Sequence, residues 1–285
     1  MKVRFCKMNG LGNEIVVIDA RASGIVLGAG GARRIGDPAS GPGCDQVMVI
    51  GSGRDGADIS AAIWNRSGEE AEACGNGARC VAAWLFREEG TSRVTMATRG
   101  GVISAQDAGG GRIAVDMGAP RFDWQDIPLA EEIRDTRAIE LQIGPIDAPI
   151  LHSPSAVNVG NPHAIFWVAE PEAFDLEKIG PLLENHPIFP QRANISLARV
   201  EDRGTIRARV WERGAGLTRA CGTAACAIAV AAARKGLADR RVTVHLPGGA
   251  LDIVWRESDG HILMTGPVAF EFEGEIELPA EGAPA

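Results

Sequence analysis

Two short stretches decide the fold of this chain, and each contains a cysteine: Ala73-Cys74-Gly75-Asn76-Gly77-Ala78 and Ala220-Cys221-Gly222-Thr223-Ala224-Ala225. The two cysteines are separated by an offset of 147 residues. Other segments match at an offset of 147 or 148: Ile63-Trp64-Asn65-Arg66 with Val210-Trp211-Glu212-Arg213, Gly12-Asn13 with Gly160-Asn161, Gln46 with Asn194, and Gly100-Gly101 with Gly248-Gly249. Several matches in a nearly constant register indicate a duplicated domain.

Each half of the chain predicts the same series of elements. A strand that ends in Gly-Asn is followed by a second strand, a short helix, and an irregular Gly/Pro-rich loop that carries Gln46 or Asn194. A further strand leads to the cysteine, and a helix then runs over 75–89 or 222–235 and is closed by a glycine. Both helices are apolar nearly all round, which is typical of buried helices.

These patterns predict an α+β fold of two pseudo-symmetric domains. Each domain is expected to be a strand-rich, barrel-like sheet wrapped around its central helix, with the active site in the cleft between the domains. The chain has 285 residues, which is enough for two domains of ordinary size. We expect the first domain over 1–121 and the second over 122–267, with a strand near 268–278 returning to the first.

Composition excludes several classes of function. The net charge of −8 and the lack of basic runs argue against nucleic acid as a partner. No apolar run is long enough to span a membrane, and the segment that starts at Met1 lacks the apolar core of a signal peptide. Six cysteines without an export signal are typical of reduced thiols, so we expect a cytoplasmic protein with no membrane association.

Cys74 and Cys221 are the strongest candidates for chemistry. Each lies just before a buried helix, where unpaired amide N–H groups and the helix dipole lower the pKa of a thiol. Each is followed by a glycine, which lets a ligand approach the backbone closely. The alternative is that both are small residues at tight turns, but their matching positions favour a function. Cys80 and Cys226 are interpreted as core residues.

Neither a metal nor an organic cofactor is expected. The chain contains no C-x-x-C motif, and its five histidines are scattered. It has four lysines, none of them in a duplicated loop, so a pyridoxal Schiff base is not expected.

Several polar residues near the duplicated motifs remain open between two interpretations. His163 follows Gly160-Asn161-Pro162, and it is either a satisfied structural residue or part of an active site. Glu212-Arg213 is either a salt bridge or a clamp for an ammonium and a carboxylate. Four asparagines follow strands, where asparagine is also a normal turn residue: Asn13, Asn65, Asn161 and Asn194.

At this level of detail the chain resembles the diaminopimelate epimerase family over essentially its whole length. These segments carry the resemblance: Lys7-Met8-Asn9-Gly10-Leu11-Gly12-Asn13, Asn65, Cys74-Gly75-Asn76-Gly77-Ala78-Arg79-Cys80, Gly160-Asn161-Pro162-His163, Arg192-Ala193-Asn194, Glu212-Arg213-Gly214-Ala215-Gly216, Ala220-Cys221-Gly222-Thr223 and Leu246-Pro247-Gly248-Gly249. The chain departs from the family at Glu14-Ile15, where aspartate and phenylalanine are usual, at Arg66-Ser67, where an Asp-Gly-Ser turn is usual, and at Ala224, where glycine is common.

The resemblance implies a cofactor-independent isomerase that interconverts LL- and meso-2,6-diaminopimelate in lysine and peptidoglycan precursor synthesis. It implies a homodimer with a small-molecule substrate. It also implies that Cys74 and Cys221 are the acid–base pair, supported by His163 and Glu212. The implied substrate-binding residues are Asn13, Gln46, Asn65, Gly75, Asn76, Asn161, Asn194, Glu212, Arg213, Gly222 and Thr223.

Two alternatives stay open on the sequence. The first is a proline or hydroxyproline racemase, which resembles this chain in fold and in its paired cysteines. The Glu212-Arg213 pair, with Asn65 and Asn194, instead favours a substrate that has a second amino acid end. The second alternative is a non-catalytic thiol protein that responds to redox conditions through a reversible Cys74–Cys221 disulfide.

Overall fold

The computed structural model describes residues 1–71 and 74–278, and the chain divides into two compact units. Unit 1 contains Met1–Asp116 and the segment from Thr265 onward, and unit 2 contains Met117–Met264. The chain therefore leaves unit 1 once and returns to it near its C-terminal end. Glu72 and Ala73, which precede Cys74, lie outside the described residues.

Unit 1 consists mainly of strands around two helices. Its strands are β1 (Lys2–Gly10), β2 (Asn13–Asp19), β3 (Gln46–Ser52), β4 (Ile59–Asn65), β5 (Glu70–Ala71), β6 (Arg93–Thr98), β7 (Gly101–Asp107), β8 (Arg112–Asp116) and β19 (Ala269–Glu277), and its helices are α1 (Ala29–Gly36) and α2 (Gly75–Glu89). The strands are hydrogen-bonded in the order β19-β1-β2-β3-β4-β6-β7-β8. The pairs β2/β3 and β4/β6 are parallel, and the other pairs in this series are antiparallel.

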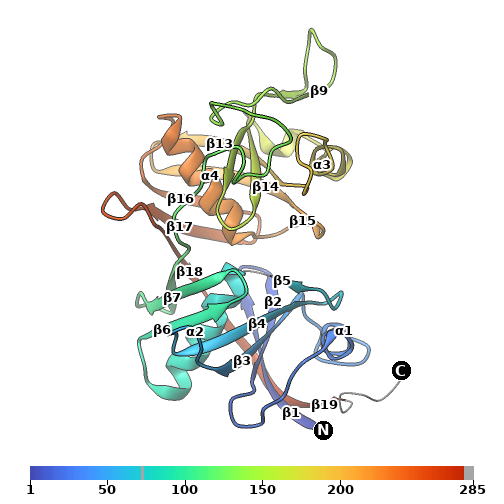
Figure 1. Ribbon diagram of the computed structural model, residues 1–285, viewed down its shortest axis with the longest axis vertical. Coiled ribbons are helices and arrows are strands. Elements are labelled where there is room, and N and C mark those ends of the chain that lie inside the picture. Colours follow the sequence, from blue (N-terminus) through green and yellow to red (C-terminus); the bar gives the residue numbers. More distant parts are fainter. Residues whose placement is uncertain (72–73, 279–285) are drawn as a thin grey trace. The chain divides into compact units, whose positions relative to one another are not determined.

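Helix α2 is the buried centre of unit 1. It packs against β1, β2, β3, β6, β7 and β8, and Figure 1 shows the strands of unit 1 arranged around it. Val81, Ala82 and Leu85 are almost completely buried, and burying a side chain of the size of Val or Leu contributes about 1.5–3 kcal/mol. The helix ends at Gly90, whose φ of 67° is left-handed, as expected for a glycine that closes a helix.

Unit 2 repeats this design. Its elements are β9 (Gln142–Ile143), β10 (Leu151–His152), β11 (Ser155–Asn158), β12 (Pro162–Trp167), η1 (Pro171–Ala173), α3 (Leu176–Glu184), β13 (Asn194–Asp202), β14 (Thr205–Glu212), β15 (Gly216–Thr218), α4 (Gly222–Arg234), β16 (Arg241–Leu246), β17 (Gly249–Trp255) and β18 (Ile262–Pro267), whose last residues belong to unit 1. Helix α4 is buried along most of its length and packs against β11, β12, β13, β16 and β17.

The strand pairings confirm the predicted fold class. In unit 2, β11/β12 is antiparallel, β12/β13 parallel, β13/β14 antiparallel, β14/β16 parallel and β16/β17 antiparallel, which is the series found from β1 to β7 in unit 1. The register is also repeated, because Ile15 lies beside Gln46 in β2/β3 and His163 lies beside Asn194 in β12/β13. The two halves are thus versions of one α+β unit.

The expectation that Gln46 and Asn194 lie in irregular loops was wrong. Each is the first residue of a strand, β3 or β13. The irregular segment that precedes each strand ends sooner than the sequence suggested. The apolar residues that follow, such as Val47 and Ile195, are completely buried. The strands β3 and β13 therefore fix where the side chains of Gln46 and Asn194 begin.

The last described strand, β19, belongs to the sheet of unit 1. It pairs antiparallel with β1 from Lys2 opposite Glu277 to Asn9 opposite Ala269 (Figure 1). Strand β1 therefore lies between β2 and β19, and Phe5 packs edge-on against Phe272.

Candidate active site

Cys74 is the N-cap residue of α2. Its backbone is extended, with φ of −147° and ψ of 106°, and its sulfur accepts a hydrogen bond from the amide of Gly77 at 3.1 Å. The first amides of a helix have no partner within the helix, and they carry its positive partial charge. The sulfur therefore lies where a thiolate is stabilised.

A second contact ties this sulfur to the strands. The thiol of Cys74 donates to Oε1 of Gln46 at 2.7 Å, and Nε2 of Gln46 donates to Oδ1 of Asn65 at 2.9 Å. Gln46 opens β3 and Asn65 closes β4, and the two residues lie opposite each other in this antiparallel pair. Because a carbonyl acceptor favours the protonated thiol and an amide donor favours the thiolate, the two contacts of the sulfur oppose each other.

The other predicted residues of unit 1 lie around this cysteine. Gly75 and Asn76 are buried in the first turn of α2. Asn13 is paired with Gly10 across the β1/β2 turn. A Cβ atom added to Gly10 would lie 3.2 Å from Cβ of Asn76, so this turn packs closely against the start of α2. Unit 1 thus brings Gln46, Asn65, Gly75 and Asn76 to Cys74, and it packs the turn before Asn13 against the start of the same helix.

Cys221 is the N-cap residue of α4 and has the same extended backbone, with φ of −127° and ψ of 114°. Its sulfur lies 3.4 Å from Oγ1 of Thr223. Burial first, and then the neighbouring carboxylate of Glu212, raise the pKa of the Cys221 thiol well above its usual value. Glu212 also accepts a hydrogen bond from the hydroxyl of Thr218 in the neighbouring strand β15. Both effects favour the protonated form of Cys221.

Asn194 connects the strands of unit 2 at the corresponding position. Its Nδ2 donates to the carbonyl of Pro162 at 2.9 Å, and its Oδ1 accepts from the backbone amide of Arg213 at 3.0 Å. The guanidinium of Arg213 donates to the carbonyl of Gln191 at 3.1 Å. Asn194 thus holds the end of β14, where the Glu212-Arg213 pair begins.

His163 is completely buried, and it lies beside Asn194 in the β12/β13 pair. Its Nε2 lies 2.7 Å from Oδ1 of Asn161. Burial, and to a lesser degree the charge of Arg213, lower the pKa of His163 to about 3. A neutral imidazole orients Asn161 but carries no positive charge near neutral pH. Gly222 and Thr223 complete the group as the buried first residues of α4.

Sequence reasoning missed one residue of this region. Glu184, the last residue of α3, is buried and accepts hydrogen bonds from Arg192, Trp211 and Gly214. An acidic residue at a helix C-terminus opposes the helix dipole, and this mismatch was the available signal.

The structure adds two negative findings. Within the part of the chain that the structure describes, no group of three or more His, Cys, Asp or Glu side chains could hold a metal ion. Over the same residues, no helix is long and apolar enough to cross a membrane.

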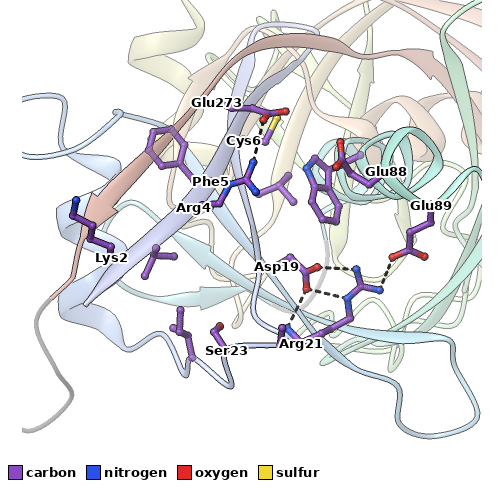
Figure 2. A pocket seen from close by; sticks show the side chains of 15 residues that line it. Lys2, Arg4, Phe5, Cys6, Asp19, Arg21, Ser23, Glu88, Glu89 and Glu273 are labelled. Atoms are coloured by element: carbon purple, nitrogen blue, oxygen red, sulfur yellow. Dashed lines mark hydrogen bonds and ion pairs between the residues drawn. The ribbon is translucent and has the colours of Figure 1, made fainter.

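The pocket shown in Figure 2 contains none of the predicted site residues. It lies in unit 1 beside β1 and β2, and it is lined by residues that include Cys6, Asp19 and Arg21. Arg21 pairs with Asp19 at 2.7 Å and with Glu89 at 2.6 Å. The guanidinium of Arg21 is therefore paired within the protein.

Comparison with known proteins identifies the family. The sequence profile described as diaminopimelate epimerase matches residues 5–122 and 155–271, which is most of the chain. The chain belongs to the diaminopimelate epimerase family. Its relatives include the diaminopimelate epimerases of Afipia carboxidovorans, which is 60% identical over 272 residues (95% of this chain and 93% of the relative), and of Nitrobacter hamburgensis, which is 57% identical over 275 residues (96% and 94%).

Solved structures extend the likeness of fold beyond this epimerase family. A hydroxyproline epimerase from Agrobacterium vitis with bound trans-4-hydroxy-L-proline matches with a TM-score of 0.68 and 15% identity, covering 98% of this chain and 94% of the other. A PhzF-family phenazine biosynthesis protein from Bacillus anthracis matches with a TM-score of 0.66 and 17% identity, covering 98% and 100%. At these identities the likeness shows a shared fold and nothing further.

Proposed function

We propose that this protein interconverts LL- and meso-2,6-diaminopimelate by a two-base proton transfer at one α-carbon, without metal or organic cofactor. The observation that carries the proposal is the placement of Cys74 and Cys221 as N-cap residues of two equivalent buried helices. The substrate follows from membership of the diaminopimelate epimerase family. The reaction belongs to the synthesis of lysine and of peptidoglycan precursors.

The chemistry is an exchange of one proton. One cysteine, as thiolate, removes the α-proton, and the electron pair of the broken C–H bond is delocalised into the α-carboxylate. The other cysteine, as thiol, delivers its proton to the opposite face and forms the new C–H bond. The roles are reversed in the reverse reaction. The proposal requires that Cys74 and Cys221 act on opposite faces of one carbon. In this scheme we assign the starting thiol to Cys221, since its burial and the carboxylate of Glu212 favour the protonated form.

An α-proton is a very weak acid, so the developing carbanion needs stabilisation. Amide groups in the first turns of α2 and α4 supply donors whose orientation is fixed before the reaction. Gly75-Asn76 and Gly222-Thr223 provide these amides. Donors of this kind are worth several kcal/mol in a site that excludes water, typically about 3–4 kcal/mol each.

The remaining residues of the site hold and select the substrate. We assign substrate binding to Asn13, Gln46, Asn65, Asn161, Asn194, Glu212 and Arg213. Glu212 and Arg213 carry opposite charges on neighbouring residues, which suits the ammonium and carboxylate of the distal end. The neutral imidazole of His163 supports this site by orienting Asn161.

The family also suggests the setting of the enzyme. We infer that it acts as a homodimer in the cytoplasm, and both inferences rest on the resemblance and on cysteine usage. Gel filtration with light scattering tests the first, because a monomer at micromolar concentration would contradict it.

Proton exchange tests the function directly. The wild-type protein is incubated with LL-diaminopimelate in D₂O under reducing conditions, and we expect the meso isomer with deuterium at one α-carbon. Cys74→Ala and Cys221→Ala should each abolish epimerisation, whereas Cys226→Ala, deeper in α4, should remain active. Activity retained in either of the first two variants would overturn the two-base mechanism. Turnover of proline comparable to diaminopimelate would favour the racemase alternative, and no exchange with any amino acid would favour the redox alternative.

A further inference from the structure

Glu184 is a buried carboxylate that accepts hydrogen bonds from two separate segments of the chain. Its side chain is 7% exposed. Oε1 accepts from Nη1 of Arg192 at 3.1 Å and from the amide of Gly214 at 3.0 Å, and Oε2 accepts from Nε1 of Trp211 at 2.7 Å. Burying a carboxylate costs free energy unless hydrogen-bond donors surround it. Glu184 and its three donors therefore restrain one another's positions.

These contacts bracket the Glu212-Arg213 pair. Trp211 precedes the pair and Gly214 follows it, and both donate to Glu184. Gly214 has a φ of 75°, so the chain turns there in the left-handed region. The amide of Arg213 is held by Asn194, so two successive amides of this turn are bound by side chains.

Glu184 also fixes the segment that carries Asn194. Arg192 has a φ of 60°, which is unfavourable for an arginine, and its guanidinium pairs with Glu184. The amide of Ala193 donates to the backbone carbonyl of Glu184 at 3.3 Å. The end of α3 therefore anchors both segments that we assign to the distal end of the substrate.

Unit 1 has no carboxylate at the position that corresponds to Glu184. Gly36 ends α1 as Glu184 ends α3, and the two positions are 148 residues apart, in register with the duplication. A Cβ atom on Gly36 would lie 2.6 Å from Cβ of Arg66, so no side chain fits there. Unit 1 has Asn65 where unit 2 has Glu212, and the buried carboxylate occurs in the half with the charged pair.

We propose that Glu184 is a positioning residue that fixes the Glu212-Arg213 turn and thereby sets selectivity for substrates with a second amino acid end. This inference rests on the proposed function. Glu184 acts through the turn and through Asn194.

The main test compares Glu184→Gln with Glu177→Gln, a matched variant at an exposed position on the same helix. Glutamine keeps the size of the side chain but places an amide nitrogen against a donor. We expect the KM for diaminopimelate to rise about tenfold or more in Glu184→Gln while kcat changes much less. Glu177→Gln should match the wild type. A KM within twofold of the wild type would overturn the proposal.

A double-mutant cycle separates positioning from general stability. If Glu184 acts through the turn, Glu184→Gln should add little to the defect of Arg213→Ala. Fully additive effects on kcat/KM would overturn the proposal.

Hydrogen exchange provides a readout that needs no substrate. The peptide covering Glu212–Gly216 should exchange about tenfold faster in Glu184→Gln, while peptides from α4 stay protected. Unchanged exchange in the turn would overturn the proposal. If the wild type fails to turn over diaminopimelate, the proposed function fails, and this measurement still decides whether Glu184 positions the turn.

Discussion

The thiol of Cys74 donates a hydrogen bond to Oε1 of Gln46, 2.7 Å away. Gln46 is held in this orientation by Asn65. The protonation state of Cys74 therefore depends on a side chain of strand β3, which is not part of the helix that Cys74 caps.

Replacing this amide with a carboxylate should make Cys74 less reactive. In Gln46→Glu, the new negative charge beside the sulfur favours the thiol over the thiolate. We expect alkylation of Cys74 by iodoacetamide at pH 7.5 to slow about tenfold, with a similar loss of kcat/KM. Peptide mass spectrometry measures the rate, and Gln106→Glu, at an exposed position on β7, is the control. An unchanged rate of alkylation would show that Gln46 does not govern this thiol.

The first turn of α2 should not tolerate a side chain at Gly77. A Cβ atom there would lie 2.5 Å from the sulfur of Met48, and the same residue donates its amide to Cys74. We expect Gly77→Ala to lower kcat/KM about tenfold or more, because relieving the clash with Met48 shifts the amide of residue 77 away from the sulfur of Cys74. Gly30→Ala, in the first turn of α1, has open space around it and should remain fully active. Equal activity of the two variants would contradict this explanation.

His163 should make unit 2 less stable in acid. Burial lowers its pKa to about 3, whereas an unfolded histidine has a pKa of about 6.5. As pH falls below about 6.5, the unfolded state binds a proton that the folded state does not, so the free energy of unfolding decreases by up to about 1.4 kcal/mol per pH unit. Between pH 6.5 and pH 5, the free energy of unfolding of His163→Gln should therefore decrease by about 2 kcal/mol less than that of the wild type.

Urea unfolding followed by pulsed hydrogen exchange in α4 peptides isolates this effect, because it reports on unit 2. His152→Gln, at an exposed position, serves as the control and should follow the wild type. An identical loss of stability in His163→Gln and the wild type would mean that His163 is not the group responsible.

Selectivity should depend on the shape of the Arg213 side chain as well as its charge. Lysine cannot reproduce the planar fork of a guanidinium, so we expect Arg213→Lys to lower kcat/KM for diaminopimelate about tenfold or more. Proline, alanine and lysine should be very poor substrates of the wild type, because they leave the distal groups unpaired. Arg203→Lys, whose arginine pairs with Asp239 on the surface, is the control. Comparable kcat/KM values for alanine and diaminopimelate would rule out this role.

Most of the fold was predictable because the chain contains it twice. Matched motifs showed the duplication, and the glycine after α2 marked the helix end that the structure has at Gly90. The strands that begin at Gln46 and Asn194 were missed because the Gly/Pro-rich segments before them obscured where the apolar runs begin.

Contacts between distant segments explain what the sequence did not show about the candidate site. Nothing local to Glu184 indicates that Trp211 and Gly214 donate to it, because these partners come together only when α3 packs on β14. Likewise, the neutral state of His163 follows from complete burial, which a single histidine after Gly-Asn-Pro does not reveal.

The pairing of β1 with β19 sets the order in which the protein is completed on the ribosome. The strand that begins at Lys2 is made first, but its neighbour from Ala269 to Glu277 follows all of unit 2. At a synthesis rate of about 5–20 residues per second, unit 2 emerges over about 7 to 30 seconds while one edge of β1 has no partner. The exposed, charged Lys2 and Arg4 on this edge discourage pairing with other chains during that interval. The half that is translated first is therefore the half that finishes folding last.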